Sequence, residues 1–75
     1  MTRHERIVRD PKVMFGKPVI RGTRVPVEHI SRKLGAGQAA EEILAAYPHL
    51  IADDILAAQA FAADFLADKV TIQAG

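Results

Sequence analysis

The sequence predicts a mainly α protein, in which a short N-terminal β-strand and a β-hairpin arm precede a three-helix, helix-turn-helix-like unit. Three observations predict this class. Up to residue 26 the apolar residues are largely β-branched and lie in short runs separated by proline and glycine, which is typical of strands and turns. From residue 27 they recur with the spacing of amphipathic helices. Residues 52–68 are rich in alanine and contain neither glycine nor proline, which favours a long third helix.

The predicted arm spans residues 5–26. Its first run, residues 5–9, favours a short strand that ends at Asp10-Pro11, because the residue before a proline is held out of the helical region. Two β-branched runs on either side of Gly22 then predict a hairpin. An isolated ribbon of this size is barely stable in water, so we expect the arm to hold together a homodimer or higher oligomer. The candidate dimerisation residues are Val19, Ile20 and Val25.

Three helices are expected between residues 27 and 69 of a single domain, and residues 70–75 are expected to fray. The first helix ends at Gly35-Ala36-Gly37, and the second occupies about residues 39–47, before a proline. The third occupies about residues 52–68 and opens with two aspartates, which favour the positive end of a helix dipole. The apolar faces of the first two helices consist of Val27, Ile30 and Leu34 and of Ile43, Leu44 and Tyr47.

Large apolar side chains occupy more than one face of the third helix. At about 100° per residue, Phe61 and Phe65 project into or beside the arc that holds the aspartates. Ile55, Leu56 and Leu66 lie on the opposite side. One face can serve the core of the chain, and the other is then a surface for a partner protein; equally, the core can take in Phe61 or Phe65 beneath the arm. The candidate partner-binding residues are Phe61, Phe65, Asp64 and Asp68.

The two halves of the chain carry opposite charges. Residues 1–33 hold nine of the ten Lys and Arg residues against three carboxylates, a net charge of +6, whereas residues 34–75 have a net charge of −5. A basic arm suits phosphates or an acidic protein surface, while DNA repels an acidic third helix. An uneven solvated surface without a partner is the alternative. The candidate DNA-binding residues are Lys17, Arg21, Arg24, Arg32 and Lys33.

The sequence brings together no set of residues that is typical of catalysis or of a cofactor site. His4, His29 and His49 are far apart and the chain has no cysteine, so we expect neither a catalytic nor a metal site. Gly16-Lys17 does not complete a phosphate-binding loop pattern. No stretch approaches the ~20 apolar residues of a membrane span. We expect a cytoplasmic binding module that is not an enzyme and uses no cofactor.

Residues 10–27 resemble the signature of a known family. With their Gly16-Lys17-Pro18 and Gly22-Thr23-Arg24-x-Pro26 core, they are similar to the family catalogued as domain of unknown function four-three-three. The later Tyr47-Pro48-His49-Leu50 follows the order of that family, and the resemblance covers about residues 5–67. It implies a homeodomain-like fold and a role as the antitoxin of a bacterial type II toxin–antitoxin pair, with a PIN-like ribonuclease as its toxin.

The chain departs from the family pattern at two helix starts. Ala39-Ala40 stands where Ser-Pro is common, and Ile51-Ala52 stands where Thr-Pro is common. Each change removes a side-chain N-cap that is worth about 1 kcal/mol, which leaves the boundaries of these two helices open while the fold is expected to be retained.

Two main functions remain open. As an antitoxin, the chain covers its toxin with the apolar, acidic C-terminal half, while the basic arm dimerises and contacts operator DNA to autoregulate the operon. As a stand-alone transcriptional regulator, it binds DNA as a dimer without a toxin. A homo-oligomeric adaptor module is a third alternative.

Overall fold

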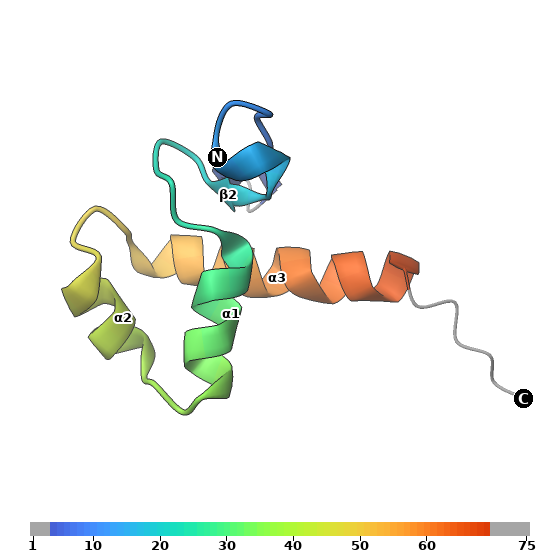
Figure 1. Cartoon of the computed structure of the whole chain (residues 1–75). Helices are drawn as coiled ribbons and strands as arrows, with labels where there is room; N and C mark the ends of the chain where they lie inside the picture. The colour runs from blue at the N-terminus through green and yellow to red at the C-terminus, as the bar shows by residue number, and fades with distance from the viewer. Residues whose placement is uncertain (1–3, 70–75) are drawn as a thin grey trace, which may run out of the picture.

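A computed structural model describes residues 4–69 of the chain. A small N-terminal sheet is followed by three helices, which confirms the predicted mainly α class. Figure 1 shows α1 crossing α3, α2 beside α1, and the C-terminal half of α3 extending past the other elements. The elements in chain order are η1 (His4–Arg6), β1 (Ile7–Val8), η2 (Met14–Gly16), β2 (Val19–Ile20), α1 (Val27–Gly35), α2 (Ala40–Ala46) and α3 (Ala52–Lys69).

The predicted hairpin is partly wrong. Strand β2 pairs antiparallel with β1, with Ile7 opposite Ile20, whereas the run before α1 contributes only an isolated bridge between Val19 and Pro26. The turn at Gly22 is nevertheless present, because the Ile20 N–H donates to the Val25 carbonyl at 3.0 Å and Gly22 adopts a φ of 79°. The Val27 N–H donates to the Pro18 carbonyl at 2.9 Å on the other side of this bridge, and α1 begins at Val27, so the pairing of the second run ends there.

The candidate dimerisation residues lie mostly inside the chain. Val19 and Ile20 are each only 1% exposed, and Val25 is half-buried against the core. The arm is therefore stabilised by the helices of its own chain, and Val19 and Ile20 would have to leave the core to contact a second copy. This burial contradicts a dimer contact through Val19 and Ile20, whereas the role of Val25 and the oligomeric state stay predictions.

The three helices begin and end within two residues of their predicted positions. Gly37, with a φ of 94°, follows α1 as expected for a glycine beyond a helix end. The starts of α2 and α3 lack side-chain caps on Ala39 and Ile51, but a carboxylate in the first turn compensates at each. Glu42 accepts the Ala39 N–H at 3.0 Å, and Asp54 accepts the Ile51 N–H at 3.0 Å.

The core lies where α3 crosses α1 beneath the sheet. Its centre is apolar, with Ile30 of α1 and Ile43 of α2 fully buried. Helix α3 contributes the small side chains of Ala57 and Ala58, which let α1 approach closely. A hydrogen bond from Ser31 of α1 to the Gln59 side chain, at 2.9 Å, also joins the two helices. Ile55 of α3 is also buried in this core, whereas Leu56, Phe65 and Leu66 remain exposed.

Candidate partner-binding groove

An open groove of about 640 Å³ lies between α1, the C-terminal half of α3 and the arm. Its apolar wall comes from α3, and Pro18 and Val27 extend that wall toward the arm and α1. Charged side chains of the arm and α1 stand at its edges. The α3 residues are Phe61, Ala62, Phe65 and Leu66, and the charged residues are Arg9, Glu28 and Arg32.

Two stacked phenylalanines and an arginine form the most distinctive part of the groove. Phe61 and Phe65 are one helical turn apart on α3, their ring centroids lie 6.2 Å apart, and their planes differ by 22°. The guanidinium carbon of Arg9 lies 5.7 Å and 5.8 Å from the two centroids, within reach of cation–π attraction. Phe61 packs half-buried against the core, whereas Phe65 remains 40% exposed. Phe61 thus contributes to the core as one of the two readings expected, whereas the partner-binding role of Phe65 stays a prediction.

The rim of the groove on α1 is an ion cluster around Glu28. Lys17 Nζ lies 2.7 Å from one Glu28 carboxylate oxygen, and Arg32 lies 3.7 Å from the other. The hydrogen bond from Lys17 lowers the pKa of Glu28 below its ordinary value, and the charges of Lys17 and Arg32 add to this shift. The carboxylate of Glu28 therefore brings together two of the predicted DNA-binding residues, Lys17 and Arg32. Both keep at least half of their side-chain surface exposed.

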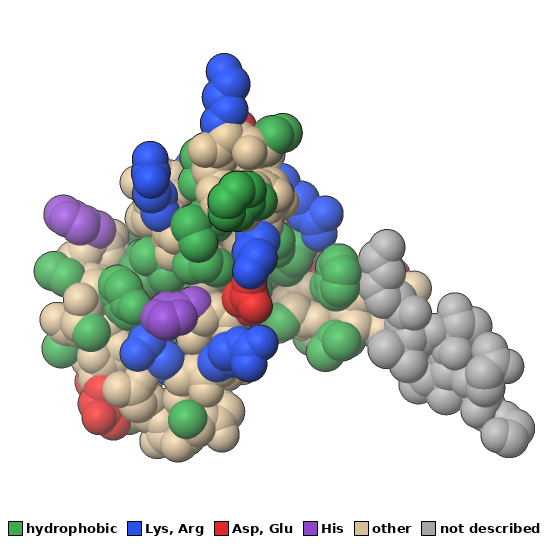
Figure 2. Space-filling model, viewed as in Figure 1, with side chains coloured by type: hydrophobic (Ala, Val, Ile, Leu, Met, Phe, Trp, Pro, Cys, Tyr) green, Lys and Arg blue, Asp and Glu red, His purple; other side chains and the backbone are tan. Residues whose placement is uncertain are grey.

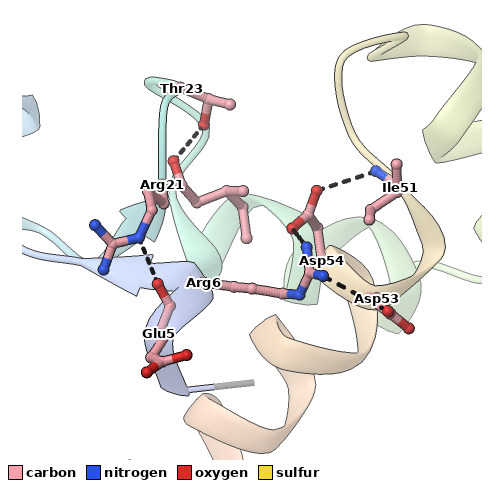
Figure 3. Close-up of polar contacts among 8 residues, drawn as sticks. Glu5, Arg6, Arg21, Thr23, Ile51, Asp53 and Asp54 are labelled. Carbon is pink, nitrogen blue, oxygen red and sulfur yellow. Dashed lines mark hydrogen bonds and ion pairs between the residues drawn. The ribbon is translucent and has the colours of Figure 1, made fainter. Parts of the chain in front are cut away.

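The other predicted DNA-binding residues come from separate places. Arg21 and Arg24 flank the turn after β2, and Lys33 lies near the end of α1. Arg21 Nε donates to the Glu5 carbonyl at 2.5 Å and so fastens the turn to η1 (Figure 3). Arg24 is exposed and Lys33 is half-buried. Figure 2 shows Lys and Arg side chains spread over the arm and α1 on the face that it views, rather than over α3.

The aspartates of α3 do not form one solvated face. Asp54 is buried at 7% exposure, and its carboxylate lies 3.1 Å from the guanidinium of Arg6, which also lies 3.6 Å from Asp53 (Figure 3). Asp64 and Asp68 are exposed on the C-terminal half of the helix, the half that carries the aromatic pair. Within residues 4–69 no group of three possible metal ligands is present, and no helix is long and apolar enough to cross a membrane.

Two arginines of the arm were missing from the sequence-based site. Arg9 follows the buried strand β1 and reaches the aromatic pair, and Arg6 precedes that strand and reaches α3. The short apolar run Ile7-Val8 that they flank was visible in the sequence as a strand. The position of this strand against α3 could not be predicted from the sequence, because it depends on a contact between residues far apart in the chain.

The arm and the three helices together carry the match to a known family. Residues 7–62 match the family model described as protein of unknown function (DUF433). The chain belongs to this family. The resemblance predicted from residues 10–27 is thereby confirmed, and Phe65, Leu66, Asp64 and Asp68 lie beyond the matched part of the DUF433 chain.

The chain is also similar to two curated proteins and to one solved structure. The DUF433 chain is 40% identical over 58 residues to uncharacterized protein y4eO of Sinorhizobium fredii (strain NBRC 101917 / NGR234). The matched segment makes up 77% of this chain but only 26% of that protein. It is also 71% identical over 24 residues to an uncharacterized protein of Archaeoglobus fulgidus. The matched segment makes up 32% of this chain and 67% of that protein. The crystal structure of a DUF433 member from Anabaena variabilis ATCC 29413 is similar, with a TM-score of 0.79 and 33% identity over 84% of this chain and 62% of that one.

Proposed function

We propose that this DUF433 chain is the antitoxin of a bacterial type II toxin–antitoxin pair, acts in the cytoplasm, and holds a segment of a PIN-like ribonuclease toxin in its aromatic groove. The observation that carries the proposal is the exposed apolar wall of this groove. Phe65 is 40% exposed and Leu66 is 58% exposed, and they adjoin the half-buried Phe61. Adjacent exposed apolar side chains of this size commonly mark a protein-binding surface.

The charges beside the groove indicate what kind of segment fits it. An apolar segment can pack on Phe65 and Leu66, with its own carboxylates toward Arg9 and Arg32 on the arm and α1 side. On the α3 side, Asp64 and Asp68 suit basic residues of the partner, such as those that a ribonuclease uses to bind RNA. The groove thus supports a protein partner of mixed charge better than it supports a nucleic acid.

The test is rescue from a PIN-like ribonuclease encoded in the same genome. Cells that express the ribonuclease alone should stop growing, and co-expression of the wild-type chain should restore growth. Phe65→Ser with Leu66→Ser should abolish both rescue and co-purification, because it removes the exposed apolar wall without touching the buried core.

The matched control is Phe15→Ser, which replaces an equally large exposed phenylalanine outside the groove. This variant should rescue growth as well as the wild type does. Equal rescue by the groove double variant would contradict the proposal, provided that circular dichroism shows both variants to be folded.

A dimeric DNA-binding regulator is the second candidate, favoured by the distribution of charge. Helix α3 has no Lys or Arg between residues 52 and 68, whereas the arm exposes Arg21 and Arg24. DNA would therefore meet the arm. Arg21→Ala with Arg24→Ala should weaken operator binding and lower its dependence on salt, as gel shifts at two salt concentrations would measure. Strong binding without a toxin would favour this function.

A further inference from the structure

The turn that contains η2 displays an aromatic side chain in a strained backbone. Met14, Phe15 and Gly16 have consecutive φ values of 50°, 58° and 81°, in the left-handed region that bulky residues rarely adopt. Phe15 is 96% exposed, so no packing of its ring within the chain compensates for this conformation. Such strain in a bulky residue, held by the surrounding structure, is typical of functional positions.

The turn is held firmly on both sides of Phe15. The Gly16 N–H donates to the Val13 carbonyl at 3.1 Å, and the Lys17 N–H donates to the Met14 carbonyl at 3.1 Å. At the base of the turn, the Val13 N–H donates to the Asp10 carbonyl at 2.8 Å. The Phe15 ring is thus presented on a fixed backbone, which lowers the entropy that a ligand loses by ordering it.

Two exposed lysines lie close to Phe15 in the sequence. Lys12 precedes η2 and Lys17 follows it, and Lys17 shares the carboxylate of Glu28 with Arg32. The nearest acidic side chain in sequence, Asp10, already accepts the Lys12 backbone N–H at 2.9 Å. Single-stranded nucleic acids bind to exposed aromatic rings that stack on a base, with cations nearby that contact the phosphates, and this turn offers both kinds of side chain.

We propose that the Phe15 turn binds nucleic acid, with the ring stacked on a base and Lys12 and Lys17 against the phosphates. A protein partner is less well matched, because protein hot spots are enclosed by a ring of neighbouring contacts and η2 adds a single further large apolar side chain, Met14, at 37% exposure. Two apolar side chains are also too few to anchor the chain in a membrane. This site is separate from the aromatic groove and does not depend on the proposed toxin.

The experiment measures binding to fluorescein-labelled oligonucleotides by anisotropy at low and at physiological salt, with a single strand in one arm and a duplex in the other. Phe15→Ala should weaken binding about ten-fold, as expected for the loss of one stacked base. Phe65→Ala is the matched control and should bind as the wild type does. A preference for the single strand would indicate an unpaired base, and a preference for the duplex would indicate a wedge between base steps; either supports the proposal.

A second variant reports stacking directly. The chain has no tryptophan, so Phe15→Trp introduces a unique indole. Its fluorescence should be quenched when the oligonucleotide binds, and affinity should be retained, because indole also stacks on bases. Unchanged fluorescence during binding, wild-type affinity of Phe15→Ala, or binding to anionic lipid vesicles but to neither oligonucleotide would overturn the proposal. Since the groove variants are tested on the ribonuclease, each proposal can fail without the other.

Discussion

The arm is fastened to α3 by the ion pair between Arg6 and Asp54, and we expect this pair to stabilise the fold strongly. Arg6 lies in η1 and Asp54 in the first turn of α3, with 3.1 Å between the guanidinium nitrogen and the carboxylate oxygen. The other carboxylate oxygen of Asp54 accepts the Ile51 N–H that begins the helix. One buried carboxylate therefore holds both the arm and the start of α3.

The expected cost of breaking this contact follows from its burial. A hydrogen bond to a charged group contributes about 1.5–3 kcal/mol, and removing one partner of a fully buried pair costs about 3–5 kcal/mol. The Arg6 side chain is 20% exposed, so we expect Arg6→Ala to lower the free energy of unfolding by about 2 kcal/mol. Asp54→Ala also removes the acceptor for the Ile51 N–H, which adds about 1 kcal/mol, for a total of about 3 kcal/mol.

Urea denaturation followed by circular dichroism would measure both single variants and the double variant. The double-mutant cycle should give a coupling energy of about 1–2 kcal/mol, because the two side chains contact each other directly. Asp53→Ala is the control: its side chain is 63% exposed and lies 3.6 Å from Arg6, so its effect should stay within about 0.5 kcal/mol. Fully additive single effects, or a loss below about 0.5 kcal/mol for Arg6→Ala, would refute the reasoning.

Three further outcomes are expected. Phe15→Gly should raise the free energy of unfolding by about 0.5–1 kcal/mol, because left-handed strain of about 1–2 kcal/mol outweighs the added chain entropy; a loss on thermal denaturation would mean that the ring packs in solution. NMR titration should place the pKa of Glu28 below 4.5, and Lys17→Met should raise it; the small stabilisation from this cluster is present above pH 4.5 and is lost as pH falls through the lowered pKa. Ile43→Ala should cost about 3 kcal/mol, against at most about 0.5 kcal/mol for Leu56→Ala, which is 47% exposed.

The three helices could be predicted because the signals that set them are local. The spacing of Val27, Ile30 and Leu34 and the glycines that follow act within a few residues, and α1 forms where they indicate. The pairing of the sheet could not be predicted in the same way. Residues 18–20 pair with both neighbouring runs, and the register that puts Ile7 opposite Ile20 depends on how both residues pack against the helices.

The candidate groove was predicted in part, for a related reason. A helical projection gives the angle of each side chain of α3 but not the direction of the core. Large residues suggested that Leu56 could lie inside, yet the crossing with α1 uses Ala57 and Ala58 because small side chains allow close approach. The projection placed Asp54 in the arc of aspartates but did not show that its carboxylate is buried against Arg6. The left-handed backbone at Phe15 has no signal in the residue types at all.

The two exposed phenylalanines differ in what their exposure implies. Phe65 is exposed because the C-terminal half of α3 extends past the rest of the fold, so a partner that covers it gains apolar burial at little conformational cost (Figure 1). Phe15 is exposed at the tip of a turn whose backbone is strained with or without a ligand, so a glycine there should make the free protein more stable while it removes the ring. A position that weakens the free fold persists when the ring has a separate use. Phe15→Gly should therefore separate stability from nucleic-acid binding, whereas polar variants of Phe65 should change partner binding with little effect on stability.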